Sequence, residues 1–559
     1  MMKRKQVLIA ALCVLIALAA VGCSKKAGAS GGSKGKLTVF IGNLDTLVTS
    51  YETKDNTFTQ RLVKETGIDL DITASANSDF PDKFNIMVST GDYPDVIMTG
   101  QARSFNRNDL DFYGRQQGIF QELDEKTLRS YPNINKVLND HADIIIKLKG
   151  SDGKFYALPD VNDCAHCTTA NGRAYYYMPW LRDYNIKPPE TIDEFTNLLR
   201  LIRDNDVNGN GNKNDEIPLI THSGTIQTFF AYLAKPFLPW VKYGNTHGVA
   251  VRDGKIWEQY RDPAFREALK YMRSIYKEGL VAENSFTMTQ DQAQALVEGN
   301  EDILGVMLVD WHSGVVRTGN PKFPLWWHAY PIEGPTGERW GSNGNPDGIL
   351  NARFVITDKC KDVALALQLY DDMLGFEQTL EGYSGAKGTF WTDPDSGALS
   401  LGGDTPKYKL LIPFGSQPVN TSWSQNNPMN RTLEFRLSEQ ATDVDTVYKF
   451  FETGDQALYP KMLENKAFNE LQWIYFDATR AKPWAIPNSY FLPPFAMNEE
   501  DGNRVSDIQA LLVDYKQKAW VEFVVGTRDI NNDAHWNTYL QELERMGSKD
   551  LVALWEKYL

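Results

Sequence analysis

The sequence is poor in the residues and motifs on which many enzymes depend. It has 7 histidines and 5 cysteines among 559 residues. It contains no H-E-x-x-H or G-x-x-x-x-G-K segment, and no G-x-S-x-G elbow between a strand and a helix. Paired carboxylates could still serve a glycosidase, but no spaced acid pair follows a predicted strand. We therefore expect no enzyme, and keep a secreted polysaccharide-processing enzyme as an alternative.

Positive charge and long apolar runs are also scarce. Lys and Arg number 58 against 72 Asp and Glu, which gives a net charge of −14. This balance argues against nucleic acid as a partner and against broad docking on anionic lipid. The apolar run from Val7 to Val21 is shorter than the roughly 20 residues that a membrane-spanning helix needs.

That apolar run belongs to a segment laid out like an export signal. Positive residues 3–5 precede it, and Cys23 follows it after small residues. Residues 20–23, Ala-Val-Gly-Cys, resemble a bacterial lipobox, although Ala20 replaces the usual leucine. We expect a lipoprotein signal peptide at residues 1–22, with lipidation of Cys23 holding the protein on the membrane's outer face. An ordinary signal peptide cut near Gly22 is the alternative.

Residues 23–36 are rich in Gly, Ser, Ala and Lys and predict a flexible tether. Strand-like and helix-like segments alternate after it. They are, in order, residues 36–41, 56–66, 68–74, 80–89 and 95–98. This order predicts an α/β fold with a mostly parallel sheet, whose ligands lie at the carboxyl ends of its strands. Asn43 and Gln101 follow two of these strands and are therefore candidate ligand-binding residues.

Several segments, in this order, resemble a known family. They read "IMVSTGDYPDVIMTG", "GSDGKFYALP", "MPWLRDYNIKPPETIDEFTNLLRLIRD" and "YMRSIYKEGLVAENSF". Together they are similar to a family 1 extracellular solute-binding lipoprotein, the receptor of a carbohydrate ABC importer. The resemblance implies a periplasmic-binding-protein-like fold: two lobes joined by a hinge, each with a mixed, mostly parallel sheet flanked by helices. It also implies a function, the capture of an oligosaccharide by hinge closure and its delivery to permease subunits.

The most oxygen-rich stretch of the chain is the loop at 206–216. Oxygen-bearing side chains recur at alternate positions, and Gly209 and Gly211 let the backbone curl, as a calcium ion requires of one loop. The candidate ligands are Asp206, Asn208, Asn210, Asn212, Asn214, Asp215 and Glu216. An EF-hand has Glu at the twelfth position, where this loop has Ile217. The loop also resembles the D-x-N-x-N loop of the alginate-oligosaccharide-binding branch, where the acidic pair comes one residue earlier. An Asn/Gly turn without metal is the alternative to a structural calcium site.

Aromatic residues make up 12% of the chain, and rings suit stacking on sugar faces. Trp311 follows the apolar run 303–309, a predicted buried strand, and is the ring we most expect in a cleft; a rim Trp packed on its own loop is the alternative. Trp340 lies among glycines and asparagines, which favours exposure. The family resemblance adds Tyr383 and Trp391 of a Gly-rich loop, with core packing as the alternative for each. Trp180 is either a core anchor or a stacking ring.

Two cysteines, Cys164 and Cys167, form a C-x-x-C pair in a polar loop. A local disulfide suits an exported chain, with two free thiols or a metal or redox role as alternatives.

The predicted division of the chain has three parts after the tether. Residues 37–160 begin the N-terminal lobe, 161–350 form a second lobe with the calcium loop, and 351–559 hold hinge crossings, further lobe elements and C-terminal helices. We expect a monomer. A surface adhesin is the alternative that is neither receptor nor enzyme.

Overall fold

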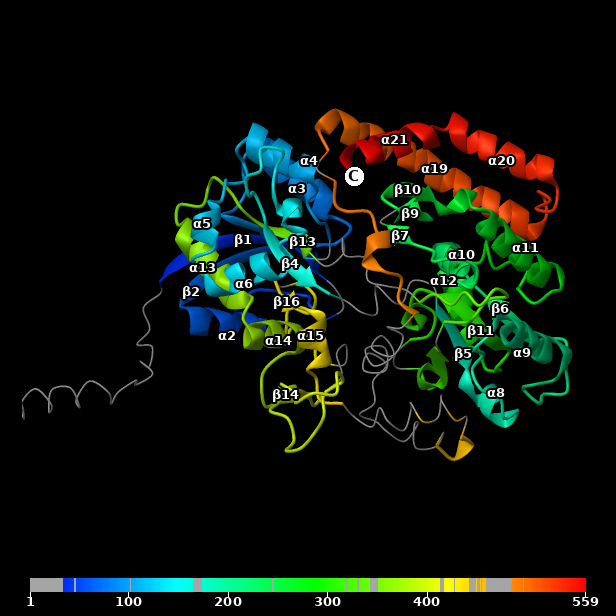
Figure 1. Ribbon diagram of the computed structural model, residues 1–559. Helices are drawn as coiled ribbons and strands as arrows, with labels where there is room; N and C mark the ends of the chain where they lie inside the picture. The colour runs from blue at the N-terminus through cyan, green and yellow to red at the C-terminus, as the bar shows by residue number, and fades with distance from the viewer. Residues whose placement is uncertain are drawn as a thin grey trace, which may run out of the picture.

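The computed structural model describes residues 34–44, 47–100, 102–163, 173–243, 246–317, 320–328, 331–341, 350–412, 417–426, 428–441, 449, 453, 455–458, 484–495 and 497–559. The predicted signal peptide, Cys23, most of the tether, Gln101, Cys164 and Cys167 lie outside these residues. Two lobes lie side by side (Figure 1). Among the described helices, none combines the length and the apolar character needed to cross a bilayer.

The first lobe is built on a six-stranded sheet in the order β16-β4-β13-β3-β1-β2. Its strands are β1 (Gly35–Leu44), β2 (Ile68–Ala76), β3 (Val96–Met98), β4 (Leu158–Asn162), β13 (Leu350–Ile356) and β16 (Asn430–Arg431). β1 pairs in parallel with β2 and β3, while β13 runs antiparallel to β3 and β4. The sheet is therefore mixed, and it combines strands that lie far apart in the sequence.

Helices cover this sheet through one apolar core. They include α2 (Thr57–Thr66), α3 (Phe80–Thr90), α6 (Pro132–Asp140) and α13 (Val363–Met373). α2 begins where the Asn56 side chain accepts hydrogen bonds from the backbone N–H groups of Phe58 and Thr59, and ends at Gly67 with φ 71°. The predicted strand–helix alternation of this region is confirmed. Further short helices are α4 (Arg107–Asp109), α5 (Glu125–Leu128), α14 (Phe376–Ser384) and α15 (Leu433–Leu437).

The second lobe has a four-stranded sheet in the order β12-β5-β11-β6. Its strands are β5 (Arg173–Tyr177), β6 (Ile217–Ile220), β11 (Leu304–Val309) and β12 (Trp326–His328). β11 is buried along its whole length, as its continuous apolar sequence predicts. It runs parallel to β6 and antiparallel to β5, and β5 also pairs antiparallel with β12. This sheet is therefore mixed, as predicted, but it is mostly antiparallel rather than mostly parallel.

The helices of the second lobe come from two separate parts of the chain. They are α8 (Met178–Asp183), α9 (Ile192–Asp204), α10 (Ile226–Ala234), α11 (Pro263–Lys277), α12 (Gln290–Val297), α19 (Glu499–Val525), α20 (Asp533–Arg545) and α21 (Ser548–Tyr558). A capping box begins α9, where the Thr191 side chain accepts the Glu194 backbone N–H and the Glu194 side chain accepts the Thr191 backbone N–H. The C-terminal helices share the second lobe's core, where the rings of Phe265 and Trp520 lie 5.1 Å apart.

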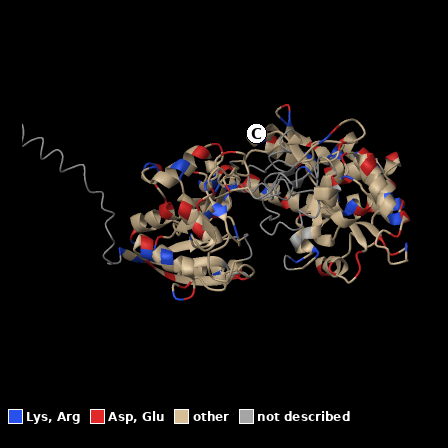
Figure 2. Ribbon diagram, turned by 90° about the horizontal axis from the view of Figure 1, so that it is seen from below, with Lys and Arg blue, Asp and Glu red and all other residues tan. Residues whose placement is uncertain are grey.

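The third predicted segment, 351–559, is divided between the lobes. Its part up to residue 441 builds the first lobe around β13 and β16, while residues 497–559 cover the second lobe (Figure 1). Two-stranded ribbons add to each lobe: β9 (Val249–Arg252) with β10 (Lys255–Glu258), and β14 (Trp391–Thr392) with β15 (Lys409–Leu410). Over both lobes, the described Lys and Arg residues are interspersed with Asp and Glu (Figure 2).

Candidate functional site

The strand directions bring one edge of each sheet to the junction between the lobes. β4 ends at Asn162, and the next strand in the chain, β5, begins at Arg173 in the other sheet. β1 and β3 end at the same edge as β4, because each of β3 and β4 runs antiparallel to β13. In the second lobe, β6 and β11 end at the edge where β5 begins. The carboxyl ends of most strands are thus directed toward the junction, the usual ligand position in such sheets.

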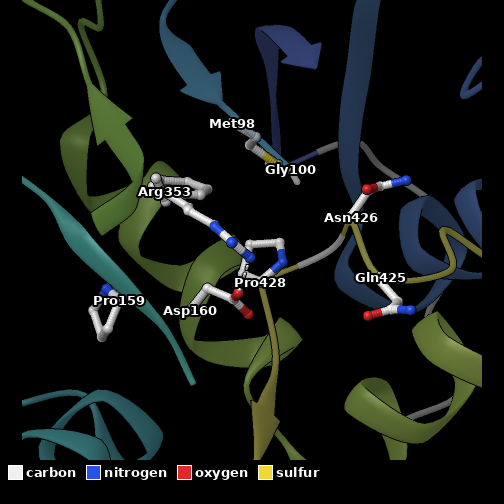
Figure 3. A pocket seen from close by; sticks show the side chains of 9 residues that line it. Met98, Gly100, Pro159, Asp160, Arg353, Gln425, Asn426 and Pro428 are labelled. Carbon is white, nitrogen blue, oxygen red and sulfur yellow. Dashed lines mark hydrogen bonds and ion pairs between the residues drawn. The ribbon is translucent and has the colours of Figure 1, made fainter. Parts of the chain in front are cut away.

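At the first lobe's edge, Asp160 and Arg353 project from β4 and β13 into a small shared cavity (Figure 3). The Arg353 guanidinium donates to the Asp160 carboxylate at 2.7 Å. The cavity is lined by Met98, Gly100, Pro159, Asp160, Arg353, Phe354, Gln425, Asn426 and Pro428. Burial raises the pKa of Asp160, and the positive charges of Arg353 and Arg431 act against that rise. Backbone and amide groups beside an ion pair offer hydrogen bonds in several directions, as a hydroxyl-rich ligand needs.

Tyr383 lies near the same edge. The guanidinium of Arg431, on β16, is 4.2 Å from the centre of the Tyr383 ring and donates to Asn162 at 3.1 Å. Tyr383 is nevertheless largely buried, and it lies in helix α14 rather than in a Gly-rich loop. The helix extends to Ser384 and ends at Gly385, whose φ of 99° favours glycine.

At the second lobe's edge, β11 delivers Asp310, Trp311 and His312. Trp311 is only partly buried, so part of this residue is accessible to solvent. The Thr228 hydroxyl donates to Asp310, and the ring of His312 lies 4.9 Å from that of Tyr175. This edge combines an aromatic ring with polar side chains, the composition of a sugar-binding surface.

Two further histidines are buried at this edge. His222 follows β6, and its pKa is lowered by burial. His328 ends β12, and its pKa is held well below the usual range by burial and by the nearby Arg173 and His312. Both side chains are therefore neutral at pH 7 and can either donate or accept a hydrogen bond.

The structure does not gather all the predicted ligand-binding residues. Trp180 is buried in the second lobe's core beyond the far end of β5, with its ring 5.3 Å from Tyr177. Trp391 is buried in a separate cluster with Leu380, and its indole N–H donates to the Gly385 carbonyl. These surroundings are those of core anchors, because both rings are almost fully buried.

Of the remaining predicted positions, two lie within the described residues and three lie outside them. Trp340 is half-buried, packs against a small cluster of Val241, Ala250, Ile486 and Phe491, and donates to Glu338. Asn43 lies at the carboxyl end of β1, at the junction edge. Gln101, Cys164 and Cys167 fall outside the described residues, so the predicted disulfide stays a prediction.

Sequence reasoning missed Asp160, Arg353 and His222. A weak signal was available for Arg353, since a charged residue interrupts the apolar strand sequence Leu-Asn-Ala-Arg-Phe-Val-Ile. Asp160 gave a similar signal, because it directly follows the buried Leu158 and Pro159 in β4. A buried charge within a strand needs a partner, and nothing local in the sequence shows where that partner is.

The predicted calcium loop lies at the opposite end of the second lobe's sheet, between α9 and β6. The Asp206 carboxylate accepts the backbone N–H groups of Asn210 and Gly211, at 3.0 and 2.8 Å. Gly209 and Gly211 have φ of 72° and 89°, so the curl uses the conformation that glycine permits. The backbone therefore wraps around the Asp206 side chain.

The exit of the loop fits a cation. Glu216 is 9% exposed, and one of its carboxylate oxygens accepts the Val207 N–H at 3.0 Å. Its other oxygen, Oε2, and Oδ1 of Asp215 are buried and have no hydrogen-bond partner among the described residues. Buried carboxylate oxygens are costly unless a positive charge compensates them, so these atoms are suited to Ca²⁺.

Comparisons with known sequences identify a family and two relatives. A family model described as bacterial extracellular solute-binding protein matches residues 49–378. The fructooligosaccharide ABC transporter substrate-binding protein FusA of Streptococcus pneumoniae serotype 4 (strain ATCC BAA-334 / TIGR4) is 25% identical over 511 residues, 89% of this chain and 86% of FusA. Lipoprotein LipO of Bacillus subtilis (strain 168) is 22% identical over 399 residues, 69% of this chain and 74% of LipO.

Solved structures show the same fold. An EF-hand mutant of S. pneumoniae FusA in complex with fructo-nystose has a TM-score of 0.66 at 21% identity, covering 94% of this chain and 98% of that one. The alginate-binding protein AlgQ2, in a crystal structure described as without calcium ion, has a TM-score of 0.59 at 18% identity, with 94% and 97% covered. The predicted two-lobed, periplasmic-binding-protein-like α/β fold is confirmed.

Proposed function

From the premise that this chain belongs to the bacterial extracellular solute-binding protein family, we propose that it is the substrate-binding lipoprotein of an ABC importer and captures an oligosaccharide. The observation that carries this proposal is the meeting of two sheet edges at the lobe junction, one bearing Asp160 and Arg353 and the other Trp311 and His222. The name of FusA, a fructooligosaccharide-binding relative over most of the chain, supports the same ligand class.

The two edges have complementary tasks in such a capture. The Trp311 ring stacks on the apolar C–H face of a sugar. Asp160, Arg353 and His222 exchange hydrogen bonds with its hydroxyl groups. Rotation of the lobes about the connecting segments closes the edges on the ligand and removes water from it. Binding energy is thus used for closure and recognition, and no bond of the sugar is broken.

The cellular setting follows from the same family. A lipid on Cys23 would hold the protein at the outer face of the bacterial cell membrane as a monomer, and LipO, a relative, is itself named a lipoprotein. Permease subunits in the same membrane would receive the sugar. We expect no catalytic activity and no binding to nucleic acid.

We also propose that the 206–216 loop binds a structural calcium ion. Oxygens of Asp206, Asn208, Asn210, Asn214, Asp215 and Glu216 and the carbonyl of Asn212 would hold it. The ion would neutralise the buried oxygens of Asp215 and Glu216 and fix the loop before β6. The EF-hand named for FusA and the calcium named for AlgQ2 support this assignment. Since the loop lies away from the lobe junction, the ion would have no role in contacting sugar.

A thermal-shift screen tests the ligand class. The mature chain, residues 23–559 with Cys23→Ser to prevent lipidation, is melted with a panel of neutral and acidic oligosaccharides, and each mixture is then analysed for new products. A ligand that binds the folded state raises the melting temperature. We expect a rise with one class of oligosaccharide and no product. Product formation would identify an enzyme, and binding of intact polysaccharide alone would identify an adhesin.

A further inference from the structure

The calcium loop has a neighbour from a distant part of the chain. β6 and β11 are parallel, and the Ile217 N–H donates to the Ile303 carbonyl at 2.6 Å. The residues that precede β11 therefore lie beside the exit of the loop. Among them is Glu301, 91 residues from Asn210 in the sequence, whose Oε2 accepts a hydrogen bond from Asn210 Nδ2 at 3.2 Å.

We propose that Glu301 is a positioning residue of the calcium site, supplied from outside the loop. The proposal rests on the calcium binding proposed above. Asn210 Nδ2 also donates to Asp215 Oδ2 at 2.7 Å, so two carboxylates hold the nitrogen side of this amide. The amide oxygen is thereby directed to the other side, into the loop, where it accepts the Asn212 N–H at 2.7 Å. Ca²⁺ binds amides through oxygen, so this orientation decides whether Asn210 can serve as a ligand.

Charge gives Glu301 a second role. The twelfth position of the loop is Ile217, which begins β6 and brings no carboxylate. Among the described residues, no three His, Cys, Asp or Glu side chains converge closely enough to hold a metal by themselves. Calcium binding at this loop therefore requires amide oxygens as ligands, together with negatively charged side chains close to them. Glu301 adds that charge on the side where Asp215 lies.

The buried oxygens at the loop exit point to a cation independently of Glu301. Glu216 Oε2 and Asp215 Oδ1 are buried and have no hydrogen-bond partner in the described part of the chain. Glu301 bonds to Asn210 Nδ2 and to neither of these two oxygens, so their need for a positive ion does not depend on Glu301. Residues that orient metal ligands usually change metal affinity by about 10–100-fold when they are replaced.

Calcium titration of Glu301→Gln tests the proposal. The chelator-treated mature chain and its variant are titrated with CaCl₂ by isothermal calorimetry, and melting temperatures are measured with chelator and with calcium. We expect calcium affinity to fall roughly tenfold or more, with an unchanged melting temperature in chelator because Glu301 is exposed. Glu301→Asp, which keeps the charge, should recover part of the affinity.

The control is Glu556→Gln, an equal loss of charge at an exposed site on α21, which should bind calcium like the unaltered chain. Equal affinity for the unaltered chain and Glu301→Gln would overturn the role of Glu301 and leave the calcium site standing. A chain that binds no calcium would overturn the site itself, and the role of Glu301 with it.

Discussion

The Asp160 carboxylate and the Arg353 guanidinium form a buried ion pair, 2.7 Å apart, between residues 193 positions apart in the sequence. Their side chains are 4% and 16% exposed. Asp160 belongs to β4, from which the chain leaves the first lobe, and Arg353 belongs to β13, by which it returns. The pair therefore joins the outgoing and returning strands at the edge where the lobes meet.

Loss of Asp160 should destabilise the first lobe. Asp160→Ala leaves the largely buried Arg353 without its carboxylate, and breaking buried pairs costs about 3–5 kcal/mol. The double variant Asp160→Leu/Arg353→Met removes both charges and should cost less than the single change. Urea unfolding of the three proteins measures the difference. A single variant as stable as the unaltered chain would show that the pair contributes nothing to the free energy of unfolding.

Replacing Trp311 and Trp180 in turn compares the loss of a ligand contact with the loss of core packing. Trp311→Ala should weaken oligosaccharide binding roughly tenfold, because a partly exposed stacking ring is lost, with little change in melting temperature. Trp180 is 4% exposed in the core, so Trp180→Ala should lower the free energy of unfolding by about 3–5 kcal/mol.

The measurements are calorimetric titration with the sugar found by thermal shift, and urea unfolding. Trp180→Ala should bind that sugar normally under conditions where it is folded. Loss of binding in Trp180→Ala but not in Trp311→Ala would reverse the two assignments.

Local signals in the sequence were sufficient for much of the fold. The cap at Asn56, the glycine at 67 and the capping box at Thr191 mark helix ends through bonds between near neighbours, and the structure contains them. The apolar run before Asp310 likewise predicts a buried strand without reference to the rest of the chain. Each of these features depends on interactions within a few residues.

The candidate site was less predictable because its groups meet only after folding. Asp160 finds Arg353 across 193 residues, and Asn210 finds Glu301 across 91. Trp391 is a candidate that folding removes from the site. Its sequence neighbours are Gly-rich and suggest an exposed loop, but the ring is buried in a cluster with Leu380, Tyr408 and Phe435. Exposure of a ring depends on what packs over it, which no local pattern reports.

Acid should destabilise the second lobe through His328. The folded protein holds the pKa of this buried imidazole well below 6.5, whereas the unfolded chain protonates it near 6.5. The unfolded state then binds more protons, so the free energy of unfolding falls as the pH drops below about 6.5. His328→Gln should lose less stability between pH 7.5 and 5.5 than the unaltered chain. The same loss in both proteins, measured by urea unfolding, would exclude His328 as the cause.

A buried lysine should produce a dependence of the same sign at alkaline pH. Lys516 on α19 is 3% exposed, with its ammonium 4.2 Å from the centre of the Tyr260 ring. Burial lowers its pKa to about 7, against the raising effect of the nearby Glu258. Between pH 7 and the lysine's ordinary pKa of 10.5, the unfolded chain holds a proton that the folded chain has released. The free energy of unfolding should therefore rise with pH across this window.

Lys516→Met removes the amine while keeping an apolar side chain of similar length. We expect it to raise the free energy of unfolding at pH 7 by roughly 1–4 kcal/mol, because a desolvated charge is replaced by an apolar group. It should also flatten the rise between pH 7 and 9. Lys518→Met, two residues away and exposed, should keep the slope of the unaltered chain. Urea unfolding at pH 7, 8 and 9 measures how the free energy of unfolding of each protein changes with pH. An equal change in Lys516→Met and the unaltered chain would show that the buried amine stays charged in the folded protein.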